Sequence, residues 1–171
     1  MALVKGPFNL VWGPTTLTDV ESVDLSFDQE SNDYTTVDGR KITIKGAISA
    51  SATITLLASD AATLSQVVPQ FAKSAGSEMT SGEVVATDKV AIDVYAGDCT
   101  TTAEKYDLDI ISCGNPGEVL RLKACVTSIS SMSLENNQVR TVEITFTGEP
   151  AQGIAAVQAF EQGALISGSS N

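Results

Sequence analysis

The sequence predicts a mainly β fold with one short α-helix, over about residues 60–68, and a long β-hairpin arm. The clearest sign is the stretch from Ile42 to Leu56, in which even positions are apolar or glycine and odd positions, apart from Ala47, are polar. Such alternation places the two kinds of side chain on opposite faces of one strand. The composition agrees, because Thr, Ser, Val and Ala are plentiful and aromatic residues make up only 5% of the chain.

The chain length of 171 residues fits one domain with a core of its own. We expect a single domain over residues 1–171, with a hairpin arm at 28–41 and a C-terminal tail at 150–171. Residues 20–27 alternate like a second strand, and Asp38-Gly39 is a tight-turn signal before the long strand. These features predict a hairpin over 20–56, in which residues 29–33 resemble a flexible tip. A bend in the long strand is expected at Gly46.

Other elements follow in chain order. Residues 6–12 predict a short strand with Trp12 as a core or interface anchor. Ser59-Asp60 provides a helix cap, and Pro69 ends the helix near Val68. The loop 73–83 has a composition typical of disorder in an isolated subunit.

The second half of the chain predicts further strands. Alternation indicates strands within 84–95, 106–110, 120–126 and 142–146, and the change of parity after Val126 predicts a bulge before Ile129. The hairpin formed by the middle two would bring the acidic pair Asp107 and Asp109 opposite Arg121 and Lys123. Residues 151–166 fit either a short helix or an extended tail laid on a neighbour.

Charge and motifs exclude several functions. The formal net charge of −11 disfavours a basic nucleic-acid-binding patch. The chain has no His, and its three cysteines, Cys99, Cys113 and Cys125, show no CxxC spacing, so reduced thiols are expected. No apolar window approaches a membrane span, and no nucleotide, hydrolase or metal motif is present. We therefore expect no enzyme activity, no cofactor and no metal.

The order of these segments over residues 6–150 resembles the major tail tube proteins of long-tailed bacteriophages, most closely those of non-contractile, siphophage-like tails. The residues that carry the resemblance are the strand ending at Trp12-Gly13, the acidic stretch through Asp38-Gly39, the long strand Ile42–Leu56 and the capped helix. The resemblance implies a small β-sandwich or barrel with one flanking helix. It also implies six-subunit rings whose long strands join into one inner β-barrel.

The same resemblance implies how the rings assemble, which partners they meet and where the protein is located. Rings would stack into a helical tube around a tape-measure protein, between tail-tip or baseplate proteins and a tail terminator, and the genome would leave through the lumen. Viral DNA is thus a passing partner without specific binding, and no membrane is involved. The protein would belong to the virion tail and assemble in the host cytoplasm. Contractile tails and secretion tubes share the fold, so the tail type stays open.

Two sets of residues are candidates for assembly. The polar face of the long strand would line the lumen, although that face could equally point outward; its candidates are Ser49, Ser51, Thr53 and Thr55. The arm, together with loop 73–83, would contact the next ring. The candidates for this contact are Asp28, Glu30, Asp33, Asp38, Arg40 and Lys41.

Two other functions fit parts of the pattern. A phage capsid decoration or stabilising protein would also be β-rich and acidic, and a trimer or monomer in solution would favour it. A carbohydrate-binding β-sandwich is disfavoured by the shortage of aromatic side chains, which such sites use to stack on sugar rings.

Overall fold

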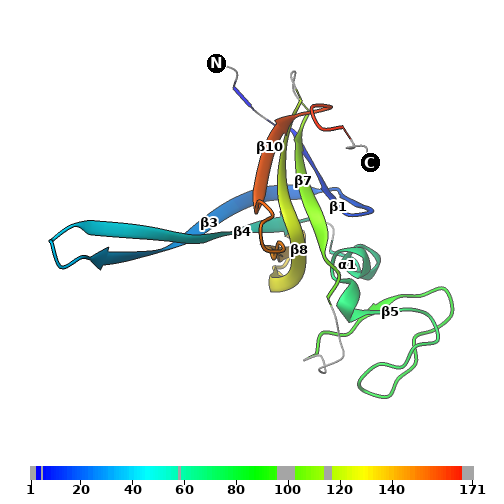
Figure 1. Ribbon diagram of the computed structural model, residues 1–171. Coiled ribbons are helices and arrows are strands. Elements are labelled where there is room, and N and C mark those ends of the chain that lie inside the picture. The colour runs from blue at the N-terminus through cyan, green and yellow to red at the C-terminus, as the bar shows by residue number, and fades with distance from the viewer. Residues whose placement is uncertain (1–2, 5, 58, 96–102, 114–116, 167–171) are drawn as a thin grey trace, which may run out of the picture.

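The chain folds as a mainly β protein, as its alternation predicted (Figure 1). The structure is a computed structural model that describes residues 3–4, 6–57, 59–95, 103–113 and 117–166. Its helices are α1 (Ala61–Val67) and the 3-10 turn η1 (Pro69–Phe71). Its strands are β1 (Phe8–Trp12), β2 (Thr15–Leu17), β3 (Val20–Thr35), β4 (Lys41–Leu56), β5 (Ala72–Lys73), β6 (Ala91–Ile92), β7 (Tyr106–Ser112), β8 (Glu118–Ser133), β9 (Thr141–Gly148) and β10 (Val157–Glu161).

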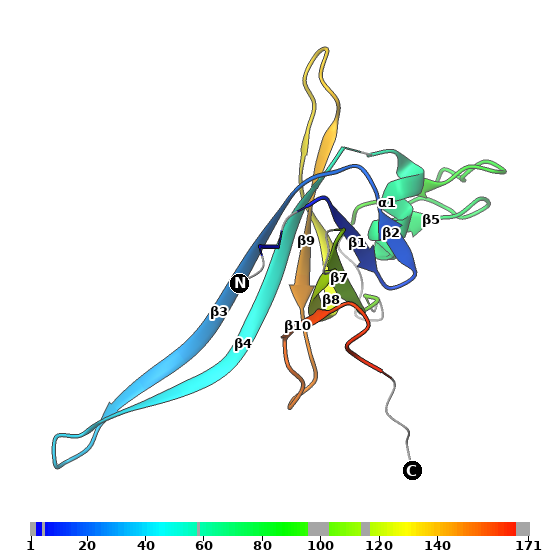
Figure 2. The same ribbon diagram turned by 90° about the horizontal axis from the view of Figure 1, so that it is seen from above.

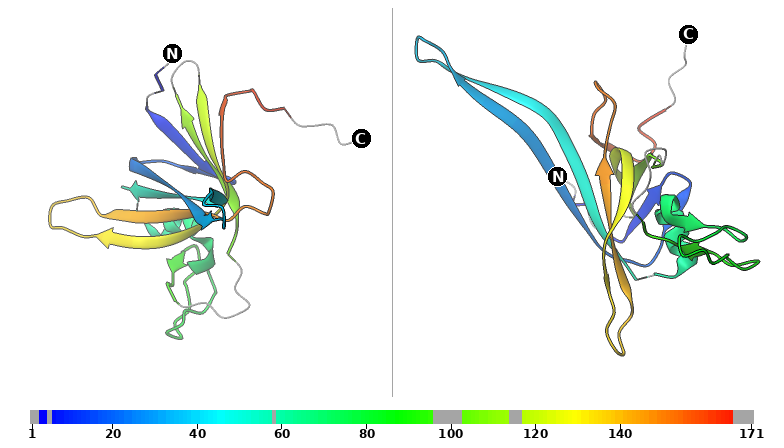
Figure 3. Two further views of the ribbon diagram at one scale, coloured as in Figure 1. Left: turned by 60° about the vertical axis from the view of Figure 1, so that its left-hand side comes forward. Right: turned by 90° about the horizontal axis from the view of Figure 1, so that it is seen from below.

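One antiparallel sheet contains all but two short strands. Its order is β2-β1-β7-β8-β9-β4-β3, and β10 joins it by pairing with β8. Strand β8 belongs to two halves of this sheet: its first part pairs with β7 and β10, and its second part pairs with β9. The sheet folds over at β8, so that the two halves enclose the core in the sandwich-like form that was expected (Figure 3).

The core lies between the two halves of the sheet. Trp12 is only 1% exposed, its indole Nε1 donates to the carbonyl of Cys125 at 3.1 Å, and its ring meets Tyr106 and Phe146 edge-on. Trp12 is therefore a core anchor, one of the two roles that the sequence left open. The side chains around it are Leu10, Leu108 and Leu122 from one half and Ala52, Ile54, Ile144 and Phe146 from the other.

Strand β8 bends at a bulge centred on Ala124. Tyr106 pairs with Cys125 and Leu108 with Leu122, so Asp107 alone faces both Lys123 and Ala124. Ala124 has a left-handed φ of 51°. The inward-facing positions change here from even to odd, because the extra residue reverses the alternation. The predicted change of parity is real, but the predicted place between Val126 and Ile129 is wrong. A second irregularity lies between Ile129 and Ser131.

Strands β3 and β4 form the predicted long hairpin, which projects far from the body (Figures 1 and 2). The turn spans Thr36–Arg40, where Gly39 has a φ of 80° and its N–H donates to the Thr36 carbonyl at 2.9 Å. The turn signal at Asp38-Gly39 is thus confirmed. Placing the tip at residues 29–33 was wrong, because those residues pair with β4 and belong to β3.

A bulge at Gly46 and Ala47 exchanges the two faces of the arm. Gln29 pairs with Ile48 and Ser31 with Lys45, so one residue of β3 faces two of β4. A side chain at position 46 would come within 3.3 Å of the Glu30 carbonyl oxygen, which explains the glycine. The bend expected at Gly46 corresponds to this bulge. Since side chains alternate along each strand, β4 side chains at even positions point to one face before the bulge and to the other face after it.

Helix α1 has the expected cap and end. The Asp60 carboxylate accepts from the backbone N–H of Thr63 at 3.3 Å and from its hydroxyl at 2.7 Å, and these bonds lower the Asp60 pKa. The helix ends before Pro69, with Leu64 and Val67 buried. It lies beside β8, because the Thr127 hydroxyl donates to the Val67 carbonyl at 2.7 Å. No helix of the described residues has the length and apolar character to cross a membrane.

Three local expectations need correction or more detail. Of the strand region expected in 84–95, only Ala91–Ile92 forms a strand, paired with Ala72–Lys73. Loop 73–83 is closed by backbone hydrogen bonds, including Gly76 N–H to the Val85 carbonyl and Met79 N–H to the Glu83 carbonyl. Residues 157–161 form neither a helix nor a tail on a neighbour, since they pair with the chain's own β8. The sequence also predicts turns at Gly97-Asp98 and over residues 113–117, and the first of these turns and most of the second lie outside the described residues.

Candidate functional site

Four long strands form a wall with one buried and one polar face. The order of this wall is β8-β9-β4-β3, with the second half of β8 at one side. The buried face carries Ala52, Ile54 and Ile144. On the other face, residues paired across the strands form rows of hydroxyls and carboxylates. One such row is Asp24, Thr53, Thr145 and Ser128, and the next is Ser22, Thr55, Glu143 and Ser131.

The four lumen candidates lie together on this polar face. Ser51, Thr53 and Thr55 are half-buried and Ser49 is exposed, while the even positions Ala50 to Leu56 between them are buried. The sequence therefore identified one strand of the polar face. It missed the contributions of β3, β9 and β8, because alternation in each strand was visible but their side-by-side register was not.

The polar face is acidic and, within the described wall, has no cationic side chain. Its carboxylates include Asp24, Asp28 and Glu143. The only Lys residues of β3 and β4 are Lys41 and Lys45, which pair with Thr35 and Ser31 on the opposite face. Such a surface offers no cation to hold a phosphate group.

Both sides of the wall end in unpaired strand edges. In the described part of the chain, no strand pairs with the outer edge of β3 over its 16 residues. At the other side, β7 pairs with β8 only as far as Cys125, so the following stretch of β8 to Ser133 has one strand neighbour, β9. Exposed edges of this length pair readily with other chains.

The six arm candidates do not form one patch. Asp28 pairs with Ser49 on the polar face, whereas Asp33 lies on the opposite face, where its carboxylate is 3.3 Å from Lys41 Nζ. Asp38 and Arg40 form a 3.0 Å ion pair within the turn. A hydrogen bond from the Thr36 hydroxyl is the main reason that the Asp38 pKa lies below its usual value. Glu30 is opposite the bulge.

The predicted ion pairs between β7 and β8 are present. Arg121 contacts Asp109 with two hydrogen bonds, of 2.7 and 3.0 Å, and Lys123 Nζ is 2.8 Å from Asp107. Asp107 also accepts from the backbone N–H of Ala124 at 3.0 Å, and so supports the bulge. Partial burial raises the Asp107 pKa, but the hydrogen bonds from Lys123 and Ala124 outweigh it and hold the pKa below its usual value.

No chemical centre is apparent among the described residues. They contain no group of three or more His, Cys, Asp or Glu side chains that could hold a metal. Cys113 is exposed and Cys125 is buried, and both are free thiols. Burial raises the pKa of Cys125 to about 12, which leaves it protonated and unreactive at neutral pH.

Comparison with known proteins rests on structure. The sequence matches no known protein family and no curated protein. A chain in the extended-state sheath/tube terminator structure of the PVC extracellular contractile injection system has a TM-score of 0.53 and 16% identity, over 92% of this chain and 99% of that one. A chain in the structure of the anti-feeding prophage cap, described as a tube terminating cap, has a TM-score of 0.52 and 14% identity, over 94% and 95% of the two chains. A chain in the PVC sheath-tube complex in its extended state has a TM-score of 0.50 and 16% identity, over 90% of this chain and 88% of that one.

These likenesses cover nearly the whole of each chain, and at such low identity they concern the fold. They confirm the predicted fold class, a mainly β structure of the tail tube type with one short flanking helix. They do not single out the siphophage kind, since two of the three come from a contractile injection system. The chain has the tail-tube fold.

Proposed function

We propose that this chain is a structural virion protein that polymerises as stacked hexameric rings and forms a phage tail tube, through which the genome passes into the host. The observation that carries the proposal is the wall of four strands with an unpaired edge at each side. The edge of β3 in one subunit can pair with the free part of β8 in the next. Such a contact joins two different surfaces, and repeated contacts of this kind close into a ring when the rotation between neighbours divides a full turn.

The size of the resulting barrel fits a conduit. Six subunits with four strands each would give about 24 strands, and at about 4.8 Å between neighbours the wall would measure about 115 Å around. The backbone-to-backbone diameter is then about 37 Å, and any tilt of the strands widens it. This is wider than a DNA duplex, with room for short serine and threonine side chains.

The chemistry of the polar face supports its assignment to the lumen. Short hydroxyl groups leave the bore open, and the carboxylates of Asp24, Asp28 and Glu143 repel phosphates instead of binding them. Ser49, Ser51, Thr53 and Thr55 would then line the bore. In this arrangement the tape-measure protein fills the lumen before ejection, baseplate and terminator proteins close the two ends, and assembly takes place in the host cytoplasm. The non-contractile tail type is part of the same proposal.

Electron microscopy of the purified protein in negative stain, together with its mass in solution, tests the proposal. Six-fold rings or hollow open-ended tubes are expected. A stable trimer without rings would refute tube formation and favour the alternative, a capsid decoration or stabilising protein.

A further inference from the structure

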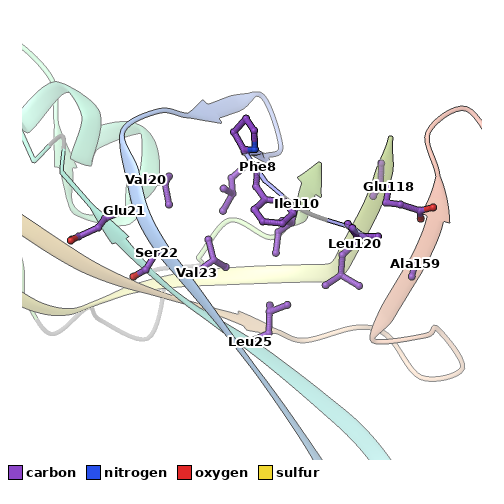
Figure 4. Close-up of a pocket in the computed structure, with 14 residues that line it drawn as sticks. Phe8, Val20, Glu21, Ser22, Val23, Leu25, Ile110, Glu118, Leu120 and Ala159 are labelled. Carbon is purple, nitrogen blue, oxygen red and sulfur yellow. The ribbon is translucent and has the colours of Figure 1, made fainter. Parts of the chain in front are cut away.

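The free edge of β3 has an apolar side that its own subunit leaves partly uncovered. A groove of about 740 Å³ runs between β3 on one side and β1, β7, β8 and β10 on the other, and Val23 and Leu25 form its β3 wall (Figure 4). Both side chains are half-buried, and Phe27, the next residue on the same face, is 55% exposed. A long, unpaired strand edge with apolar side chains readily pairs with another edge of the same kind. The β3 edges of two copies are therefore potential partners.

Pairing between two β3 edges would be symmetric, and its two faces would have opposite effects. A two-fold axis at Ser26 places Leu25 of each copy opposite Phe27 of the other on the apolar face, which favours the pair. On the polar face, the same axis places Asp24 of each copy opposite Asp28 of the other. Carboxylates in direct cross-strand positions repel each other, and this contact would contain two such pairs. An axis at Asp24 or at Asp28 would set that residue against itself.

Most carboxylates of β3 have no cation beside them. The strand contains five acidic residues and no Lys or Arg. Among the described residues, only one of the five, Asp33, takes part in an ion pair, and its partner is Lys41. Glu21, Asp24, Asp28 and Glu30 are therefore not neutralised within the described part of the subunit.

The free edge of β8 has a different character. Residues 126–133 contain four serines and no charged side chain. Ser128 and Ser133 lie on the polar face, and among the described residues their hydroxyls make no hydrogen bond. The Glu143 carboxylate lies one strand further from this edge and already accepts from the Ser131 hydroxyl at 2.9 Å. The β8 edge thus offers hydroxyl donors to a carboxylate, where a second β3 edge offers like charge.

We propose that the carboxylates of Asp24 and Asp28 determine which edge β3 accepts: they reject the β3 edge of a second copy and accept the serine edge of β8. This inference rests on the proposed ring and adds the reason that its contacts join unlike edges. Adjacent strands of the wall are antiparallel, so β8 of the next copy also runs antiparallel to β3 and continues the ladder. A two-fold β3–β3 dimer would occupy both β3 edges and stop the growth of the ring, and the repulsion prevents it.

Removal of the two charges tests the proposal. In Asp24→Asn/Asp28→Asn the β3–β3 contact loses both repelling pairs, so its association constant should rise about tenfold and the yield of tubes should fall. Glu104→Gln/Glu149→Gln is the matched control, because it removes the same charge from exposed residues outside β3 and β8 and should change neither quantity. Sedimentation of the purified full-length proteins measures the dimer, and negative-stain microscopy measures the tubes.

A thiol at position 26 identifies the dimer as a contact between two β3 edges. In protein with Cys99 and Cys113 replaced by serine, Ser26→Cys places its thiol on the two-fold axis, where the thiols of the two copies meet. Oxidation should give disulfide-linked dimers in the Asp24→Asn/Asp28→Asn background and few with both aspartates intact. Ser51→Cys is the matched control, because Ser51 pairs with Ser26 one strand away from the edge and should give little dimer in either background.

The outcomes separate this proposal from the tube itself. If the wild type forms tubes and the Ser26→Cys disulfide yield is equal with and without the two aspartates, selection by charge is wrong while the tube stands. If the wild type forms the β3–β3 dimer in place of rings or tubes, both proposals are wrong.

Discussion

Asp107 is expected to hold the bulge that folds the sheet over, and its replacement by alanine should destabilise the subunit markedly. The carboxylate makes two contacts, to the Ala124 N–H at 3.0 Å and to Lys123 Nζ at 2.8 Å. Ala124 has a left-handed φ of 51°, a conformation that a non-glycine residue adopts only when its surroundings hold it. Removing the carboxylate leaves the Ala124 N–H without this acceptor.

The two contacts of the Asp107 carboxylate differ in how much they contribute to the free energy of unfolding. A hydrogen bond from a backbone N–H to a charged acceptor contributes about 1.5–3 kcal/mol. The ion pair with Lys123 is partly exposed, with the two side chains 25% and 36% accessible, so it adds at most about 1 kcal/mol. We expect Asp107→Ala to lower the free energy of unfolding by about 2–3 kcal/mol. Asp107→Asn keeps an acceptor for Ala124 and should cost about 1 kcal/mol.

Asp109→Ala is the matched control. Asp109 lies two residues away on the same strand and pairs with Arg121 as Asp107 pairs with Lys123, but among the described residues no backbone N–H donates to its carboxylate. Its loss should cost about 1 kcal/mol or less. Urea unfolding followed by the fluorescence of Trp12, at a concentration below that of assembly, measures both variants. Equal losses for Asp107→Ala and Asp109→Ala would refute the role of Asp107 at the bulge.

The Asp107 carboxylate also predicts how the stability of the subunit depends on pH. The Asp107 pKa is lowered in the folded subunit, so its stabilisation is fully present above the ordinary Asp value of about 3.9 and is lost as the pH falls toward the lowered value. The difference in stability between wild type and Asp107→Asn should therefore be constant near neutral pH and shrink below about pH 4. A difference that grows in acid would contradict the sign of the shift.

Three further predictions concern assembly and reactivity. Amides of loop 73–83 should exchange faster in the monomer than in the assembly, and equal protection in both states would rule out a contact there. In protein with Cys99 replaced by serine, Cys113 should react with a thiol reagent at pH 8, and Cys125 only after unfolding, because it is buried with a pKa of about 12. A variant that reverses the charges of Asp28, Glu30 and Asp33 should form short tubes or none. Tubes of normal length in that variant would exclude a contact between the arm and the next ring.

Local patterns in the sequence determined much of the fold. The strand at Ile42–Leu56, the turn at Asp38-Gly39, the cap at Asp60 and the end of the helix before Pro69 were all predicted, because each depends on residues close together in the chain. The ion pairs of Asp107 and Asp109 could be predicted as well, since a hairpin brings nearby segments into register.

Only the tertiary structure decided the places where alternation breaks. Alternation in one strand fixes which residues share a face, but it does not fix which core or solvent that face meets. The bulges at Ala124 and at Gly46 follow from pairing with β7 and β3, and the latter moves Ile42 and Ile44 to the face opposite the core. The candidate site likewise has one part that the sequence predicted and another part that only the tertiary structure defines. Ser49 to Thr55 were found from one strand, whereas the unpaired edges of β3 and β8, and the groove beside β3, depend on contacts between segments distant in sequence.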